Sequence, residues 1–303
     1  MQAARSRGIS GALAALALAA GLLYGAGVAA RPALAAPSEA GAARARMALP
    51  DPHGPTASSD PGPTPTPPPD PARVAEIIGE SVGGRPLEVF RFGSGPRARM
   101  IVAGIHGGYE WNTIALAREL IADLQDRPAQ VPPHLTLYVL PALNPDGAAR
   151  STSYAGRAND HGVDLNRNWP VRWLPEWPRA GCWAFLPIGA GADPASEPET
   201  RALMGFLLER RVEALVSYHS AALGVFAGLD PEHAPSLDLA ARLAAVTGYP
   251  FPPVETGCLY TGQLVDWAAA SGIAAVDVEL STHWGTDLRQ NQALLEAFLA
   301  WEP

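Results

Sequence analysis

Four side chains that can bind a metal or move a proton follow apolar runs typical of buried strands. His106, His219 and Glu279 each come at the end of such a run, and Glu110 follows His106 within the stretch GIHGGYEWN (104–112). Ligand sites in layered α/β domains form at strand ends, where side chains reach solvent while the backbone stays fixed. Each residue alone is more often an ordinary hydrogen-bonded loop residue, but several at equivalent places favour one shared site. Imidazole and carboxylate groups at such places suit metal binding or acid–base chemistry.

A second polar region, residues 142–170, adds donors for anions. It contains few residues that could form a core, and Asn144-Pro145-Asp146-Gly147 is a strong turn signal. Connections longer than about 12–15 residues are usually functional or disordered. Arg157, Asn166 and Arg167 offer planar donors that can hold a carboxylate or a developing oxyanion.

The elements that must position these residues alternate between strand and helix patterns. Apolar, β-branched runs predict strands at 86–92, 98–105, 135–141, 212–219 and 273–280. Helical spacing predicts helices at 111–125, 196–211 (with Ser196 as its cap), 236–247, 262–271 and 287–300. This alternation indicates an α/β layered domain around a largely parallel sheet.

Composition excludes several functions. The chain has 303 residues, 48% of them hydrophobic, which is enough for one substantial core. Its net charge is −8 and it has no cluster of basic residues, so we do not expect it to bind nucleic acid. All basic residues besides histidine are arginine, so Schiff-base lysines and phosphate-loop lysines are excluded.

The N-terminus predicts export. Arg5 and Arg7 precede an uncharged run, 8–30, and a small-residue cleavage signal at 33–35. The run is long for a signal peptide, so an uncleaved membrane anchor remains an alternative. We expect no other segment to contact the membrane. We therefore expect a secreted or extracytoplasmic protein with a signal or anchor at 1–35, a Pro-rich disordered linker at 36–72 and a folded domain at 73–303. In an oxidising compartment, Cys182 and Cys258 are expected to form a disulfide.

The motifs taken together carry a family resemblance. GIHGGYEWN, NPDG, RANDHGVDLNRNWP, SEPET, SYHS, GQLVDW and VEL occur in this order across residues 74–300. The chain thus resembles the M14 (carboxypeptidase A-like) zinc carboxypeptidases, in particular the compact bacterial members. The resemblance implies a mixed eight-stranded sheet between helices in α/β/α layers. It also implies one Zn²⁺ ion held by His106, Glu110 and His219.

The spacing of the first motif departs from the family pattern. Members of the family usually have two residues between the first histidine and the glutamate, whereas here Gly107, Gly108 and Tyr109 intervene. The two glycines can let the backbone bulge and return Glu110 to the metal. Tyr109, which strict spacing would select, is an implausible zinc ligand.

The resemblance also implies roles for the other polar residues. Glu279 matches the general base and Arg157 the arginine that stabilises the oxyanion. Asn166 and Arg167 match the pair that binds the substrate's free C-terminal carboxylate. Tyr260 is either the tyrosine that closes over the substrate or an ordinary core tyrosine.

Val265 falls at the base of the family's side-chain pocket, which argues against basic substrates, although Asp266 stands next to it. A one-residue shift in the alignment would reverse that conclusion.

Four functions remain open at this point. The first is a metallocarboxypeptidase acting on peptides, and the second an amidase cutting γ-D-glutamyl–diaminopimelate bonds in cell-wall peptides. The third is a deacylase of N-acyl amino acids, and the fourth a non-catalytic binding module. We expect a monomer. We also expect no inhibitory propeptide domain, because residues 36–72 cannot build a core. Catalysis is favoured because His106, His219, Arg157 and Glu279 are all present.

Overall fold

The computed structural model describes residues 75–178 and 187–303. The expected signal or anchor at 1–35, the expected linker at 36–72 and Cys182 lie outside the described residues. The described chain begins in a strand at Ala75, close to the expected start of the folded domain. Within the described part, no helix is long and apolar enough to cross a membrane.

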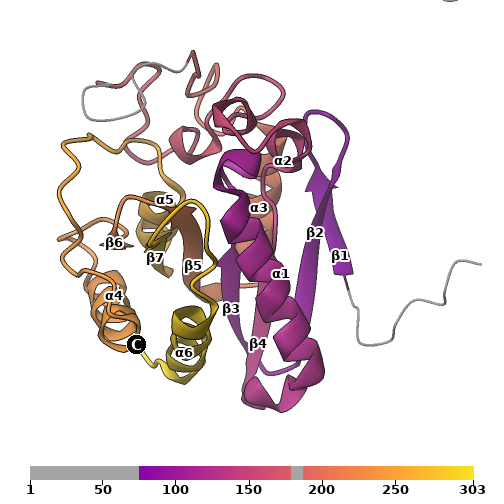
Figure 1. Cartoon of the computed structure of the whole chain (residues 1–303), viewed down its shortest axis with the longest axis vertical. Coiled ribbons are helices and arrows are strands. Elements are labelled where there is room, and N and C mark those ends of the chain that lie inside the picture. The colour runs from indigo at the N-terminus through magenta and orange to yellow at the C-terminus, as the bar shows by residue number, and fades with distance from the viewer. Residues whose placement is uncertain (1–74, 179–186) are drawn as a thin grey trace, which may run out of the picture. The chain divides into compact units, whose positions relative to one another are not determined.

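The centre of the domain is a seven-stranded mixed sheet in the order β1-β2-β4-β3-β5-β7-β6 (Figure 1). The strands are β1 (Ala75–Glu80), β2 (Pro86–Gly93), β3 (Arg97–Val102), β4 (Leu135–Leu140), β5 (Val212–Ser220), β6 (Gly224–Ala227) and β7 (Ala274–Leu280). The four central strands, β4, β3, β5 and β7, run parallel, whereas β1, β2 and β6 pair antiparallel at the two edges. The expected mixed sheet is confirmed, and only its centre is parallel.

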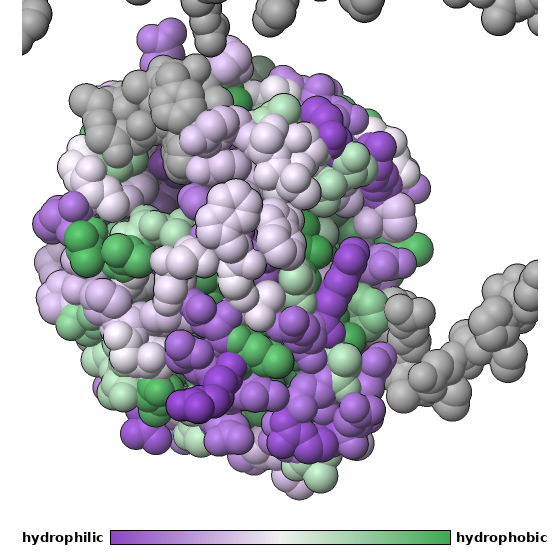
Figure 2. Space-filling view, in the orientation of Figure 1, coloured by the Kyte–Doolittle hydropathy of each residue, from purple (hydrophilic) through white to green (hydrophobic). Residues whose placement is uncertain are grey.

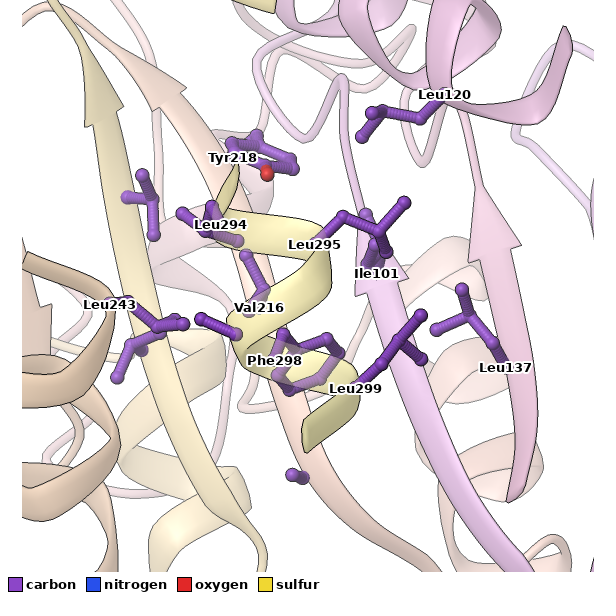
Figure 3. Close-up of a cluster of buried hydrophobic side chains, with 14 of the residues drawn as sticks. Ile101, Leu120, Leu137, Val216, Tyr218, Leu243, Leu294, Leu295, Phe298 and Leu299 are labelled. Atoms are coloured by element: carbon purple, nitrogen blue, oxygen red, sulfur yellow. The ribbon is translucent and has the colours of Figure 1, made fainter. Parts of the chain in front are cut away.

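Helices cover both faces of this sheet. They are α1 (Trp111–Asp126), α2 (Pro145–Arg150), α3 (Pro198–Glu209), α4 (Ala234–Thr247), α5 (Leu264–Ala270) and α6 (Leu288–Ala300). Helices α1, α4 and α6 pack on one face, and Leu294, Leu295 and Phe298 of α6 meet Ile101 and Val216 of the sheet there (Figure 3). Helices α3 and α5 pack on the other face, against alternate residues of the same strands. The layers are therefore α/β/α, as expected.

The surface over α1 and α6 is largely polar. Figure 2 shows hydrophilic side chains over this face with apolar ones scattered among them. In α1 the buried positions Leu116, Leu120 and Leu124 recur every four residues and form part of the face that packs on the sheet.

The sheet has one strand fewer than the eight expected, counted over residues 75–178 and 187–303. A further strand could have followed β6, where two hydrogen bonds join Val225 N to Pro250 O and Val254 N to Leu223 O. Pro250, Pro252 and Pro253 have no N–H group to donate, so this segment cannot continue a ladder. It stays irregular instead.

Several element boundaries differ from those expected. The strand expected at 98–105 ends at Val102 because Gly104 adopts a left-handed φ of +61°. The helix cap is Glu197 rather than Ser196, whose hydroxyl donates to the Glu197 carboxylate at 2.6 Å. The short elements β1, β6 and α2 carried too few periodic residues to be predicted.

The segment 142–170 contains more core than its composition indicated. Leu143, Leu165 and Trp169 are fully buried. Two 3-10 turns, Tyr154–Gly156 and Leu165–Arg167, follow α2 within it. The segment is thus an ordered part of the domain, which lets it hold side chains in fixed positions.

Candidate active site

His106, Glu110 and His219 converge beyond the ends of β3 and β5. His106 Nδ1 lies 2.7 Å from Glu110 Oε1 and 3.2 Å from His219 Nδ1, and the latter lies 3.3 Å from Glu110 Oε2. All three side chains are buried. They form the one group within the described residues whose donor atoms could hold a metal ion.

The tight turn between His106 and Glu110 explains this convergence. Residues Gly107–Glu110 form a 3-10 turn that leads directly into α1, and this turn returns Glu110 to the imidazole. Gly107 has φ +50°, and a Cβ on Gly108 would lie 2.0 Å from the Ser151 carbonyl oxygen. Glycine is therefore required at both positions. The ring of Tyr109 instead stacks on the ring of Tyr154, with 5.0 Å between the ring centroids.

The donor set suits zinc. Two neutral imidazoles and one carboxylate are common ligands of catalytic zinc, and three protein ligands leave one position open. Tetrahedral bonds of about 2.0–2.1 Å place ligand atoms roughly 3.3–3.4 Å apart. Both distances from His219 Nδ1 are close to this value. The shorter 2.7 Å contact is a direct hydrogen bond between His106 and Glu110, which a cation would replace.

Asp164 orients the first histidine from behind, and sequence reasoning missed it. Its Oδ1 accepts from His106 Nε2 at 3.0 Å, so that Nδ1, which now contacts Glu110, is the nitrogen that faces the metal-binding group. Its Oδ2 accepts from Arg157 Nε at 3.0 Å. Burial alone would raise the pKa of Asp164, but the charges of Arg157 and His106 outweigh it and hold this pKa well below the usual range. The available signal was an acid two residues before Asn166 in a motif-rich segment.

Arg157 is buried beside His106 and Asp164. Its Nη1 donates to Glu110 Oε1 at 3.3 Å and its Nη2 lies 2.9 Å from His106 Nε2. The site thus places the expected oxyanion arginine beside the metal-binding group. Burial would raise the pKa of Glu110, but the two histidines outweigh burial and lower it, so the carboxylate is charged.

Glu279 stands on β7 beside His219 on β5. Its carboxylate accepts from the Ala222 N–H at 2.9 Å. Burial raises the pKa of Glu279 to about 7; the His219 charge opposes this rise and the Glu110 charge adds to it. A carboxylate that takes up a proton near neutral pH is suited to a general base.

Asn166 and Arg167 line the same cavity as these residues, and Asn166 Nδ2 lies 3.4 Å from His219 Nε2. Asn166 accepts from the Leu264 N–H at 2.9 Å, and Arg167 Nη1 donates to the Asn166 carbonyl at 2.7 Å. Arg167 Nε is buried and has no hydrogen-bond partner among residues 75–178 and 187–303. Burial lowers the pKa of Arg167. A buried guanidinium with a spare donor favours an anionic ligand.

Tyr260 borders the cavity rather than sitting in the core. Its hydroxyl pairs with Thr256 Oγ1 at 2.7 Å, and its ring lies 5.6 Å from the Arg167 guanidinium carbon. Burial raises the pKa of Tyr260, which keeps the phenol neutral. The interpretation of Tyr260 as a core tyrosine is therefore wrong.

One cavity of about 320 Å³ collects all eight of the predicted site residues. Val265, expected at its base, does not line it, because this residue packs into the apolar cluster between α5 and the sheet. Asp266 does not line it either and accepts from the Leu229 N–H. Residues that the sequence did not single out also line it, among them Phe226, Thr256, Gln263, Asp277 and His283.

Cys258 also borders this cavity and is not a free thiol. Because Cys182 lies outside the described residues, its pairing with Cys258 stays a prediction.

A family model and individual relatives match the chain. The zinc carboxypeptidase model, Peptidase M14, matches residues 68–245. Carboxypeptidase A6 of Mus musculus is 30% identical over 246 residues, covering 69% of this chain and 56% of that protein. The chain spans about half the length of the two mammalian carboxypeptidase A6 proteins it matches.

A bacterial relative matches over nearly its whole length. Murein peptide amidase A of Escherichia coli K12 is 27% identical over 239 residues, covering 75% of this chain and 90% of that protein. The solved structure of murein-tripeptide amidase from Escherichia coli O157 superposes with a TM-score of 0.56 at 26% identity, covering 76% of this chain and 92% of that one. Its fold therefore extends over the described domain.

Proposed function

The chain belongs to the zinc carboxypeptidase family, peptidase M14, and on that premise we propose that it hydrolyses the amide bond before a C-terminal residue. The observation that carries this proposal is the convergence of His106, Glu110 and His219 in one cavity with Glu279. The family model ends at residue 245, so the role of Glu279 rests on its position beside His219.

We propose His106, Glu110 and His219 as the ligands of one zinc ion. Zinc held there supplies Lewis acidity, which lowers the pKa of water towards 7 and polarises a carbonyl group. Asp164 fixes the tautomer of His106, so that Nδ1 presents its lone pair to the cation. Glu110 contributes the negative charge that offsets part of the metal's charge.

Glu279 acts as the proton carrier in this proposal. Its carboxylate takes a proton from the attacking water and delivers it to the nitrogen of the leaving amine. Arg157 donates to the oxyanion that develops on the former carbonyl oxygen, a contribution of about 2.7–4 kcal/mol for a single donor in other enzymes.

Asn166 and Arg167 select the end of the substrate. The spare Nε donor of Arg167 suits a free terminal carboxylate. Tyr260, whose ring borders the guanidinium, closes over the bound residue. An amidated terminus cannot accept both charge-assisted hydrogen bonds, so blocking it removes binding energy.

Cell-wall peptides are the second candidate substrate. The Escherichia coli murein peptide amidase A aligns over 90% of its length, whereas the mouse carboxypeptidase A6 aligns over 56% of its own. The chain thus has the compact size of the amidase. Export by residues 1–35, with the stretch 36–72 as a spacer before a catalytic domain at 73–303, would place a monomer near the cell wall. Deacylation of N-acyl amino acids needs the same carboxylate clamp, and a non-catalytic module predicts no turnover at all.

A product assay on the purified full-length protein separates these functions. Linear peptides with varied termini, one amidated peptide, an N-acyl amino acid and a γ-D-glutamyl–diaminopimelate muropeptide are incubated together, with and without a zinc chelator. Mass spectrometry then identifies the products. Chelator-sensitive loss of single residues from the free peptides supports a carboxypeptidase, and release of diaminopimelate alone supports the amidase. Absence of all products from a zinc-loaded sample would remove the proposal.

A further inference from the structure

Asp277 is a buried acid in the cavity wall to which the proposed reaction gives no role. It is 3% exposed, and its Oδ1 has no hydrogen-bond partner among the described residues. One ionic neighbour is His219, whose Nε2 lies 3.3 Å from Oδ1. A buried carboxylate oxygen without a hydrogen bond is costly, so folds retain one mainly where a ligand or a specific task requires it.

The strand register places Asp277 on the same face of the sheet as the proposed base. Asp277 pairs with Ser217, and Glu279 pairs with His219, on the parallel strands β7 and β5. Residues two apart on a strand share a face and are separated by roughly 6.6 Å. Asp277 therefore lies two residues before Glu279 on the same face of β7, and its charge acts on Arg167, the proposed binder of the terminal carboxylate.

Among the described residues, the cavity presents a buried donor without a hydrogen-bond partner and a buried carboxylate whose Oδ1 lies 3.3 Å from His219 Nε2. Arg167 Nε and Asp277 Oδ1 are both buried, and neither has a hydrogen-bond partner within the described part of the chain. Both residues line the same cavity. A ligand that satisfies both must carry a carboxylate for Arg167 and a cation for Asp277.

The remaining wall does not form an apolar pocket. Beyond the proposed site residues and Asp277, most of its lining is polar, with Phe226 and two alanines among Ser220, Thr256, Cys258, Gln263 and His283. Val265, whose apolar side chain argued against basic substrates, packs in the core instead. The acid that could select a basic residue is thus Asp277 rather than Asp266.

We propose that Asp277 determines specificity by binding the positively charged side chain of the residue that the enzyme releases. Lysine, ornithine and diaminopimelate belong to this class. The proposal rests on the proposed hydrolase function, and it applies equally to a peptide and to a γ-glutamyl amide. A merely structural Asp277 would hold His219 in place and would affect every substrate alike.

Four substrates test this distinction on the full-length zinc-loaded protein. Hippuryl-lysine and γ-D-glutamyl-lysine are compared with hippuryl-norleucine and γ-D-glutamyl-norleucine, which keep the aliphatic stem without the ammonium group. We expect kcat/KM to favour lysine by about 10- to 100-fold in the series that is cleaved. In Asp277→Asn the lysine value should fall by a similar factor while the norleucine value stays within about threefold.

Asp266→Asn is the matched control. Asp266 is a neighbouring buried acid outside the cavity, so its variant should keep the lysine preference of the wild type. Substrates ending in Nε-acetyl-lysine remove the charge from the ligand instead, and the wild type should lose the same 10- to 100-fold on them. This arm keeps the test decisive even where Asp277→Asn fails to fold.

Three outcomes overturn the specificity proposal. A wild type that prefers norleucine or ignores acetylation leaves the hydrolase function intact but removes Asp277 as its selector. An equal loss on both substrates in Asp277→Asn, accompanied by loss of zinc, shows a positioning role only. Failure to cleave any of the four substrates, in a sample that is active in the product assay above, removes the specificity proposal and leaves the hydrolase function intact.

Discussion

His219 and Glu279 are directly paired in the register of the parallel strands β5 and β7. A proposed metal ligand and the proposed base are therefore fixed by the same ladder of backbone hydrogen bonds, one strand apart. Rigid strands hold catalytic groups more accurately than loops do. The arrangement lets the carboxylate reach a water beside the metal site without competing for the cation.

Replacing Glu279 by Gln should remove turnover and leave the metal site intact. The amide keeps the shape and can still accept from the Ala222 N–H, but it cannot take a proton. We expect kcat to fall by about 10²- to 10⁴-fold, with an unchanged zinc content by plasma mass spectrometry. A variant that retains more than a tenth of wild-type activity would exclude Glu279 as the base.

The pH profile should carry the signature of the same group. Burial raises the pKa of Glu279 to about 7, so the protonated, inactive form accumulates as the pH falls below this value. A cation bound nearby opposes this rise and lowers the pKa of Glu279. The acid limb of kcat/KM should thus have its midpoint at or below about pH 7, and activity should rise with pH through it. A profile that is flat between pH 5 and 7, or that rises only above pH 8, contradicts this assignment.

The same raised pKa has a consequence for stability. The folded protein holds the Glu279 proton more tightly than the unfolded chain does, so this group stabilises the fold at low pH. That contribution is lost as the pH rises from the ordinary value of 4.5 towards 7. Glu279→Gln should remove this loss, which thermal melts of the metal-free protein at pH 5 and pH 8 can detect.

Much of the site could be predicted from the sequence because several of its polar side chains follow the ends of buried strands. His106, His219 and Glu279 follow long apolar runs, and such runs report buried strands reliably. The sequence also indicated that two glycines let Glu110 rejoin His106, and the 3-10 turn achieves this.

The rest of the site depends on contacts between distant segments. The family resemblance places Val265 at the base of the side-chain pocket, but Val265 packs into the core. The acid that lines the cavity is Asp277, and nothing in the neighbouring sequence indicates this. Asp164 meets His106 across 58 positions, and the partner of a loop acid cannot be deduced from its neighbours. The eighth strand, which the described residues lack, was likewise an expectation from the family, and the three prolines beside β6 have no N–H groups to extend the sheet there.

Replacing Asp164 by Asn should weaken zinc binding rather than chemistry. The asparagine can present an N–H group where His106 Nε2 needs an acceptor, so the imidazole loses its orientation. Loss of such a partner costs about 10- to 100-fold in metal affinity. Competition with a chromogenic chelator measures this affinity, and excess zinc should restore most of the activity. Asp160→Asn, a change at a more exposed aspartate that contacts Arg150, is the control. Equal affinities for zinc in the Asp164 variant and the wild type would refute the role.

Replacing Gly108 by Ala should disrupt the turn that carries Glu110. The new Cβ would lie 2.0 Å from the Ser151 carbonyl oxygen, which belongs to the backbone and cannot rotate away. The turn or the 142–170 segment must shift, at a cost of about 1–3 kcal/mol, and zinc affinity should fall as Glu110 moves. Gly205→Ala in α3 is the matched control, because its Cβ would meet open space and alanine favours a helix by about 1 kcal/mol. Chemical denaturation should therefore move the two variants in opposite directions. If Gly108→Ala were as stable as the wild type and bound zinc as tightly, the close packing of this turn would not be what places Glu110.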